Sequence, residues 1–168
     1  MNRRNFVELC TCYGVALAFT NSFAYSVLAQ KQKSSTLAKI LKSNEEWKKI
    51  LSSEQYYITR QAGTEAPYSS PLLEIHDKGT FDCVCCALPL FSSDTKFDSQ
   101  TGWPSFWAPI AKQNVQEKVD KSLEEVRTEV LCARCDAHLG HVFEDGPPPT
   151  GLRYCMNGVA LKLSPKTS

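Results

Sequence analysis

Two Cys-x-x-Cys pairs constrain the fold of this chain more than any other feature of its sequence. Cys83 and Cys86 form the first pair, Cys132 and Cys135 form the second, and 45 residues lie between them. Two residues between cysteines allow a tight turn to direct both sulfurs at one ion, and four thiolates in a tetrahedron are the usual ligands of structural zinc. Because four protein ligands leave no open position for water or substrate, we expect one zinc ion with a structural role. Two disulfides are the alternative.

The length and composition predict one folded domain with an appendage. The chain has 168 residues, of which 42% are hydrophobic and 10% aromatic, and this is enough for one core. With 19 basic and 18 acidic residues the formal net charge is +1, which excludes the strongly basic surface of a typical nucleic-acid-binding protein. We therefore expect no nucleic-acid partner. We also expect the protein to be a monomer.

The first 29 residues resemble a twin-arginine export signal. Arg3 and Arg4 precede an apolar run over 9–28, but the threonine, asparagine and serine residues within it make a poor membrane span. We expect cleavage before Gln30, export to the periplasm or a comparable lumen, and no stable membrane association afterwards. Glu8 departs from the pattern, because a basic residue tends to follow the phenylalanine there. An uncleaved anchor and a chance basic start are the alternatives.

The segment after the predicted signal is polar at first and then helical. Residues 30–43 are polar and basic, so they predict a linker. Ser43 and Glu46 have the spacing of a capping box, with an apolar stripe behind it. One short helix over 44–53 is the expected result.

The rest of the chain has the signals of strands rather than helices. Glycine, proline and serine residues over 61–73 predict mostly loop. Beyond them, apolar and polar residues alternate with the period of a strand at 115–119, 126–130 and 159–163. These patterns predict a mainly β domain with a helix at its front.

One cysteine outside the four proposed ligands lies in a setting that suits redox chemistry. Removal of the signal would leave six cysteines, so the zinc site would leave Cys85 and Cys155. Cys85 lies between two proposed ligands, and we interpret it as a spectator. Cys155 lies between Arg153 and Asn157, and alternation along a strand would place all three side chains on one face. A neighbouring cation favours thiolate over thiol, although an inert cysteine in a half-buried strand is the alternative.

Two histidines and a tryptophan are further candidates for the site. His138 and His141 directly follow the second cysteine pair, so a metal would fix the start of their segment. Imidazoles at these positions could donate a proton to a substrate oxygen while a thiolate attacks the adjacent atom. Trp103 could provide an apolar wall for a methyl group and a polarizable sulfur, although core packing explains most aromatic residues.

Three segments together resemble a known enzyme family. GTFDCVCC, FDSQTGWPSFW and CARCDAHLGHVFEDGPPPTGLRYCMNGVALKL, taken in this order, look like a methionine-R-sulfoxide reductase of the B type. The resemblance implies a domain over 44–165 with small antiparallel sheets around the active site, arranged like a tent, one or two short N-terminal helices and a structural zinc. It also implies reduction of methionine R-sulfoxide, protein-bound or free, in the repair of oxidised proteins.

The resemblance further assigns a role to each candidate residue. Cys155 would attack the sulfoxide sulfur and become a sulfenic acid. His138 and His141 would bind and protonate the oxygen, Arg153 and Asn157 would lower the pKa of the thiol, and Trp103 would hold the methyl group. Asp136 and Asp145 could orient the two histidines.

One position departs from the family pattern. Many relatives have a resolving cysteine just before the Gly-Trp-Pro segment, and here that position is Thr101. Threonine cannot form a disulfide with oxidised Cys155, so we expect a thioredoxin-like protein or a small thiol to reduce the sulfenic acid directly. A loop movement that brings Cys85 or another cysteine into range is the alternative.

Two other classes of function are compatible with parts of the sequence. A zinc-stabilised peptide-binding module would have an inert Cys155 and would use Trp103 in its binding surface. A cysteine hydrolase would use a Cys/His pair, but no oxyanion hole can be inferred from the sequence.

Overall fold

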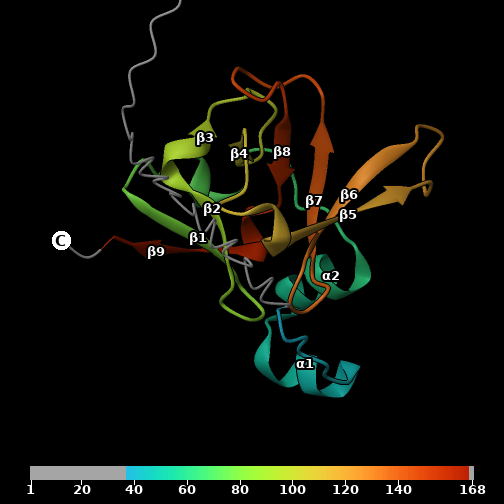
Figure 1. Cartoon of the computed structure of the whole chain (residues 1–168). Helices are drawn as coiled ribbons and strands as arrows, with labels where there is room; N and C mark the ends of the chain where they lie inside the picture. Colours follow the sequence, from blue (N-terminus) through green and yellow to red (C-terminus); the bar gives the residue numbers. More distant parts are fainter. Residues whose placement is uncertain (1–36, 167–168) are drawn as a thin grey trace, which may run out of the picture. The chain divides into compact units, whose positions relative to one another are not determined.

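The computed structural model describes residues 37–166, which fold as two short helices followed by two antiparallel sheets (Figure 1). The prediction of a mainly β domain with antiparallel sheets and one or two short N-terminal helices is confirmed. The predicted export signal over 1–29 lies outside the described residues, and so does the first half of the predicted linker, 30–36. No helix within 37–166 is long and apolar enough to cross a membrane.

The two helices replace the single helix predicted over 44–53. Helix α1 (Asn44–Ile50) begins at the expected capping box, and α2 (Ser53–Gln61) begins at a second one. In the second box the Gln55 amide donates to the Ser52 hydroxyl at 3.1 Å, and the Ser52 amide donates to the Gln55 side chain at 3.0 Å. Ser52 must be extended to cap α2, so the first helix ends before it. The spacing of Ser52 and Gln55, S-x-x-Q, is the sequence signal that marks the start of this second helix.

The strands form two separate sheets. The small sheet has the order β2-β1-β9, with β1 (Gly79–Cys83), β2 (Pro89–Ser92) and β9 (Leu161–Pro165). The large sheet has the order β3-β4-β8-β7-β6-β5, with β3 (Lys96–Phe97), β4 (Ser105–Phe106), β5 (Val115–Asp120), β6 (Arg127–Cys132), β7 (His138–Phe143) and β8 (Arg153–Met156). Figure 1 shows β5 and β6 as a hairpin at the side of the large sheet.

Aromatic side chains join the two sheets. Phe81 and Phe91 come from the small sheet, and Phe106 and Tyr154 come from the large one. The Phe106 ring stacks on Phe91 at 4.5 Å and meets the edge of Phe81 at 5.0 Å, and all four side chains are buried. Offset and edge-to-face contacts of this kind favour one relative orientation of the sheets, so the core fixes the position of β4 and β8.

Strand β8 lies between β4 and β7, and this placement builds the functional site. Tyr154 and Met156 point into the core, whereas Arg153 and Cys155 lie on the other, half-buried face, as alternation along the strand predicted. In the register of the sheet, Cys155 lies opposite Ser105 on one side and opposite His141 on the other. The fold therefore brings an imidazole and a hydroxyl beside the thiol.

Candidate active site

Cys155 opens onto a small pocket at the centre of the large sheet. The pocket has a volume of about 110 Å³, which suits a single side chain. It is lined by Thr64, Trp103, Arg127, Gly140, His141, Phe143, Cys155 and Asn157. Of the predicted catalytic and substrate-binding residues, four line the pocket: Trp103, His141, Cys155 and Asn157. The other two, His138 and Arg153, do not line it.

The environment of the Cys155 thiol raises its pKa above the ordinary value of 9.0. Burial disfavours the charged thiolate, and this effect outweighs the opposing hydrogen bond of Thr101 and the charge of Arg153. The Arg153 guanidinium is held by Asp145 through two hydrogen bonds, of 2.8 and 2.7 Å, and it lies over the Phe143 ring at 4.4 Å. Arg153 lowers the pKa of the thiol, as the sequence led us to expect, but burial is the larger effect and the net shift is upward.

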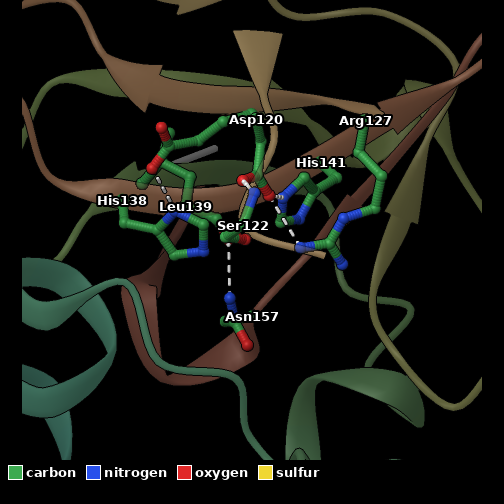
Figure 2. Close-up of polar contacts among 8 residues, drawn as sticks. Asp120, Ser122, Arg127, His138, Leu139, His141 and Asn157 are labelled. Carbon is green, nitrogen blue, oxygen red and sulfur yellow. Dashed lines mark hydrogen bonds and ion pairs between the residues drawn. The ribbon is translucent and has the colours of Figure 1, made fainter. Parts of the chain in front are cut away.

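Each histidine is held by a carboxylate that the sequence analysis did not select (Figure 2). His138 Nδ1 lies 2.7 Å from Glu129 Oε1, and His141 Nε2 lies 2.8 Å from Asp120 Oδ2. The expectation that Asp136 and Asp145 orient the histidines is wrong. Asp136 pairs with Lys39 and Asp145 pairs with Arg153, so neither carboxylate holds a histidine.

Asp120 is itself fixed at the end of the β5–β6 hairpin. Arg127 Nη2 donates to its carboxylate at 2.7 Å, and the Ser122 amide donates to it at 2.9 Å. These donors hold the pKa of Asp120 well below its usual range, with the hydrogen bonds from Ser122 as the largest cause. Asp120 and Arg127 are opposite one another in the hairpin register, so a search for charge pairs across predicted hairpins could have found them.

The two histidines occupy different environments. His141 lines the pocket, and its Nε2 is bonded to Asp120, so Nδ1 is the nitrogen left for a ligand. His138 is 4% exposed, and among the described residues its Nε2 has no hydrogen-bond partner. Burial lowers the pKa of His138, and the bond to Glu129 opposes this shift. The rings meet edge to face at 5.5 Å.

Asn157 and Trp103 are joined by a residue that the sequence analysis missed. The Asn157 side chain donates to the Leu139 carbonyl at 3.2 Å and accepts from the Glu65 amide at 3.0 Å, so both its polar ends bond the backbone. Trp103 Nε1 donates to the Glu65 carbonyl at 3.1 Å. No pattern in the sequence marks Glu65, because it is an isolated acidic residue within a predicted loop.

The Glu65 carboxylate is buried beneath the turn that follows β8. It accepts hydrogen bonds from the amides of Gly158 at 2.6 Å and Val159 at 2.9 Å. Burial raises the pKa of Glu65 above its ordinary value, and the two amide donors act against that shift. Glu65 thus connects the loop after α2 to the segment that carries Asn157.

The four cysteines of the two Cys-x-x-Cys pairs come together at the C-terminal ends of β1 and β6. Their sulfurs all lie within 4.8 Å of one another, with Cys83 and Cys135 at 3.7 Å and Cys86 and Cys132 at 3.5 Å. Zn–S bonds of about 2.3 Å in a tetrahedron place neighbouring sulfurs about 3.8 Å apart, so the cluster has the right size for that ion. All six cysteines within 37–166 are unbridged, which argues against two disulfides.

The two cysteine turns have the same backbone geometry. In each, the fourth residue after the first cysteine has a left-handed conformation, Ala87 with φ 55° and Asp136 with φ 56°. The Ala87 amide donates to the Cys83 carbonyl at 2.8 Å, and the Asp136 amide donates to the Cys132 carbonyl at 2.9 Å. Two matched turns aim two pairs of sulfurs at one point, so the four cysteines can hold a metal ion.

Comparison with known proteins decides the family. The SelR domain model matches residues 51–165, which is more than half of the chain. The chain belongs to the SelR family. It is 53% identical over 125 residues to the peptide methionine sulfoxide reductase MsrB of Herminiimonas arsenicoxydans, a match that covers 74% of this chain and 91% of the relative. It is 56% identical over 128 residues to the enzyme of the same name from Pseudomonas savastanoi pv. phaseolicola, covering 76% and 98%.

SelR membership confirms the resemblance to B-type methionine sulfoxide reductases that the three sequence segments indicated. The matched range includes all the predicted site residues and both cysteine pairs. The pocket, the histidines with their carboxylates and the cysteine cluster therefore belong to the SelR domain.

Proposed function

We propose that this chain reduces methionine R-sulfoxide, in proteins or free, in the repair of oxidised proteins, with Cys155 as the nucleophile. The observation that carries the proposal is that Cys155, His141 and Trp103 line one pocket in a chain that is more than half identical, over the aligned residues, to named methionine sulfoxide reductases. The volume of about 110 Å³ supports a substrate that inserts one side chain.

The first half of the reaction transfers oxygen from the substrate to Cys155. The Cys155 sulfur attacks the sulfoxide sulfur, and the sulfoxide oxygen is protonated, because an unprotonated oxide is a poor leaving group. Methionine leaves with its sulfur reduced by two electrons, and Cys155 becomes the sulfenic acid Cys–S–OH, oxidised by two electrons. His141 supplies the proton through Nδ1, since its other nitrogen is bonded to Asp120.

The surrounding residues place the substrate and the acid. Trp103 packs against the methyl group, and its orientation is held by the bond to the Glu65 carbonyl. His138 lies behind His141 and supports its ring through the edge-to-face contact. Asn157 keeps the backbone of β7 in place through Leu139, and Arg153 lends positive charge to the thiolate within its ion pair with Asp145.

The second half of the reaction returns Cys155 to the thiol without an internal disulfide. Thr101 lies beside Cys155 at 3.8 Å, in the position where many relatives have a cysteine. A thiol reductant, either a thioredoxin-like protein or a small molecule, attacks the sulfenic acid and releases water. A second thiol then releases Cys155 and leaves as the disulfide of the reductant. Mass spectrometry after one equivalent of substrate distinguishes a sulfenic acid from an intramolecular disulfide.

The four-cysteine cluster would hold a structural zinc ion. Cys83, Cys86, Cys132 and Cys135 would be the ligands, and the ion would join the turn after β1 to the turn after β6. Metal analysis of the purified protein should find one zinc per chain. Replacement of Cys132 by serine should reduce that content, whereas replacement of Cys85 should leave it unchanged.

The activity test is the replacement of Cys155 by serine. Reduction of the R epimer of methionine sulfoxide should be lost, the S epimer should not be reduced by either protein, and the zinc content should be unchanged. Substantial activity of Cys155→Ser would refute the mechanism. A peptide-binding module without catalysis would instead leave Cys155 unreactive towards alkylating agents at neutral pH.

The N-terminal segment exports the protein to the periplasm or a comparable lumen. The paired arginines Arg3 and Arg4 and the mild apolar run support this part of the proposal. The N-terminus of protein recovered from that compartment should be Gln30. Replacement of both arginines by lysine should keep the precursor inside the cell, and unchanged export of this variant would contradict a twin-arginine route.

A further inference from the structure

Three hydroxyl groups form a continuous chain of hydrogen bonds from the Cys155 sulfur to a backbone carbonyl. Thr101 Oγ1 lies 3.8 Å from Cys155 Sγ and 2.8 Å from Ser99 Oγ. Ser99 Oγ lies 2.7 Å from Ser105 Oγ, and Ser105 Oγ donates to the Trp103 carbonyl at 3.1 Å. The family comparison assigns no role to these hydroxyls.

The direction of the chain follows from the single hydrogen of each hydroxyl. Because Ser105 donates to the Trp103 carbonyl, it must accept from Ser99. Ser99 has then used its hydrogen, so Thr101 must donate to Ser99. With the chain in this order, the Thr101 oxygen faces Cys155 as an acceptor, and the arrangement suits the thiol form, whose S–H can donate.

The thiolate form requires the opposite order. A thiolate has no hydrogen to donate, so the sulfur needs a donor, and Thr101 lies within hydrogen-bond distance of it, with Ser105 as a second hydroxyl neighbour. If Thr101 donates to the sulfur, Ser99 donates to Thr101 and Ser105 donates to Ser99. Ser105 is only 1% exposed, so bulk water does not reach its hydroxyl and the hydrogen bonds must reverse among the three hydroxyls themselves.

We propose that Thr101 is a catalytic residue that donates a hydrogen bond to the Cys155 thiolate, and that Ser99 and Ser105 position it through a hydroxyl chain that reverses when the thiol ionises. This inference rests on the proposed role of Cys155 as nucleophile. On ionisation the S–H bond breaks and its proton leaves to water in the pocket. The three hydroxyl hydrogens only turn about their C–O bonds, and no other covalent bond changes.

Each charged group that faces Cys155 has an acidic partner of its own, although the Arg153 side chain also interacts with the thiol. Arg153, on the same strand, is held by Asp145, and His141, opposite on β7, is held by Asp120. From β4, the residue opposite Cys155 is the uncharged Ser105. The hydroxyl chain is therefore the part of the environment that can change its polarity as the thiol ionises, without moving a charged side chain.

The test measures thiolate formation directly, without turnover. The full-length zinc-bound protein is treated with iodoacetamide over a range of pH, and the label on the peptide that contains Cys155 is quantified by mass spectrometry, which separates it from every other cysteine. In Thr101→Val, which keeps the shape and removes the hydroxyl, the midpoint of alkylation should move up by roughly one pH unit. That corresponds to about tenfold slower labelling below the midpoint.

Two further variants test the hydroxyl itself and its position in the chain. Thr101→Ser keeps the donor and should retain the midpoint of the unmodified protein to within a few tenths of a unit. Ser99→Ala removes the hydroxyl that positions Thr101 and donates to it in the thiolate form, so its midpoint should move up, by less than that of Thr101→Val. An unchanged or lowered midpoint in Ser99→Ala would overturn the role of the hydroxyl chain.

A matched control separates the hydroxyl from general effects of a Thr→Val change. Thr128, on β6, lies on the strand face opposite to Arg127 and Glu129, so Thr128→Val should leave the midpoint unchanged. An unchanged midpoint in Thr101→Val would overturn this inference while leaving the proposed function intact. Retained reductase activity in Cys155→Ser would instead refute the proposed function, so the two failures are distinguishable.

Discussion

Replacement of Asp120 by asparagine tests whether a carboxylate sets the protonation of His141. The carboxylate accepts from the Arg127 guanidinium at 2.7 Å and faces His141 Nε2 at 2.8 Å. An amide keeps the shape of the side chain, but it cannot stabilise the imidazolium by charge, and its NH₂ group can turn towards Nε2 and impose the wrong tautomer. We expect a slow enzyme that still binds its substrate.

The magnitude follows from the contact that is lost. A hydrogen bond to a charged group contributes about 1.5–3 kcal/mol. The Asp120 side chain is only 15% exposed, so screening by solvent removes little of this value. In the proposed mechanism the imidazolium protonates the sulfoxide oxygen, so the loss should appear in the rate, as a decrease in kcat of roughly ten- to one-hundred-fold. KM should change by less than about threefold.

The assay is steady-state reduction of a peptide with methionine R-sulfoxide at neutral pH. Glu117→Gln is the matched control, because Glu117 lies on the same strand and accepts from the Tyr154 hydroxyl at 3.0 Å, away from the pocket. Equal kcat values for Asp120→Asn and the unmodified protein would refute this reasoning.

Two further predictions concern the segment after β8 and the backbone beside Cys155. Glu65 has a pKa raised by burial, so the folded state favours its neutral form. Its contribution to stability is therefore lost as pH rises from about 4.5 through the folded pKa. Glu65→Gln should flatten this part of the dependence of the unfolding free energy on pH, and an unchanged slope would contradict the prediction. A Cβ at Gly140 would lie 2.2 Å from the Cys155 carbonyl oxygen, so Gly140→Ala should lower the free energy of unfolding in urea by about 1–3 kcal/mol and reduce activity. An equally stable Gly140→Ala protein would show that the strands can separate without cost.

The sequence predicted the parts of the fold and the site that depend on local patterns. The capping box at Ser43, the alternation along β8 and the spacing of the cysteines each involve residues within a few positions of one another, and the structure has all three. The second helix was missed only because its S-x-x-Q cap directly follows the first helix. Local pattern was sufficient where local geometry determines the outcome.

The carboxylates that hold the histidines could not be predicted in this way. Glu129 and Asp120 reach the two rings from a neighbouring hairpin, 9 and 21 residues away in sequence. Asp136 and Asp145 are closer in sequence, but the left-handed turn at Asp136 and the ion pair of Asp145 direct them elsewhere. The raised pKa of the thiol likewise depends on burial between β4 and β7, which no single segment encodes.

The metal cluster and the redox pocket are mechanically connected through two strands. Strand β6 begins with Arg127, which holds Asp120, and it ends at the metal-site residue Cys132. Strand β7 begins at His138, three residues after Cys135, and it carries His141 into the pocket. An ion bound by the four cysteines would therefore fix one end of both strands that place His141 and Asp120.

Removal of the metal should consequently affect the pocket before it unfolds the core. After treatment with a chelator, amide hydrogen exchange should rise first in β6 and β7, while the amides beside Phe81 and Phe91 in the small sheet remain protected. Reductase activity should fall in parallel with the protection of His141, because the imidazole loses its fixed distance to Asp120. A metal-free protein with full activity and unchanged exchange in β6 and β7 would show that the pocket is held by the sheet alone.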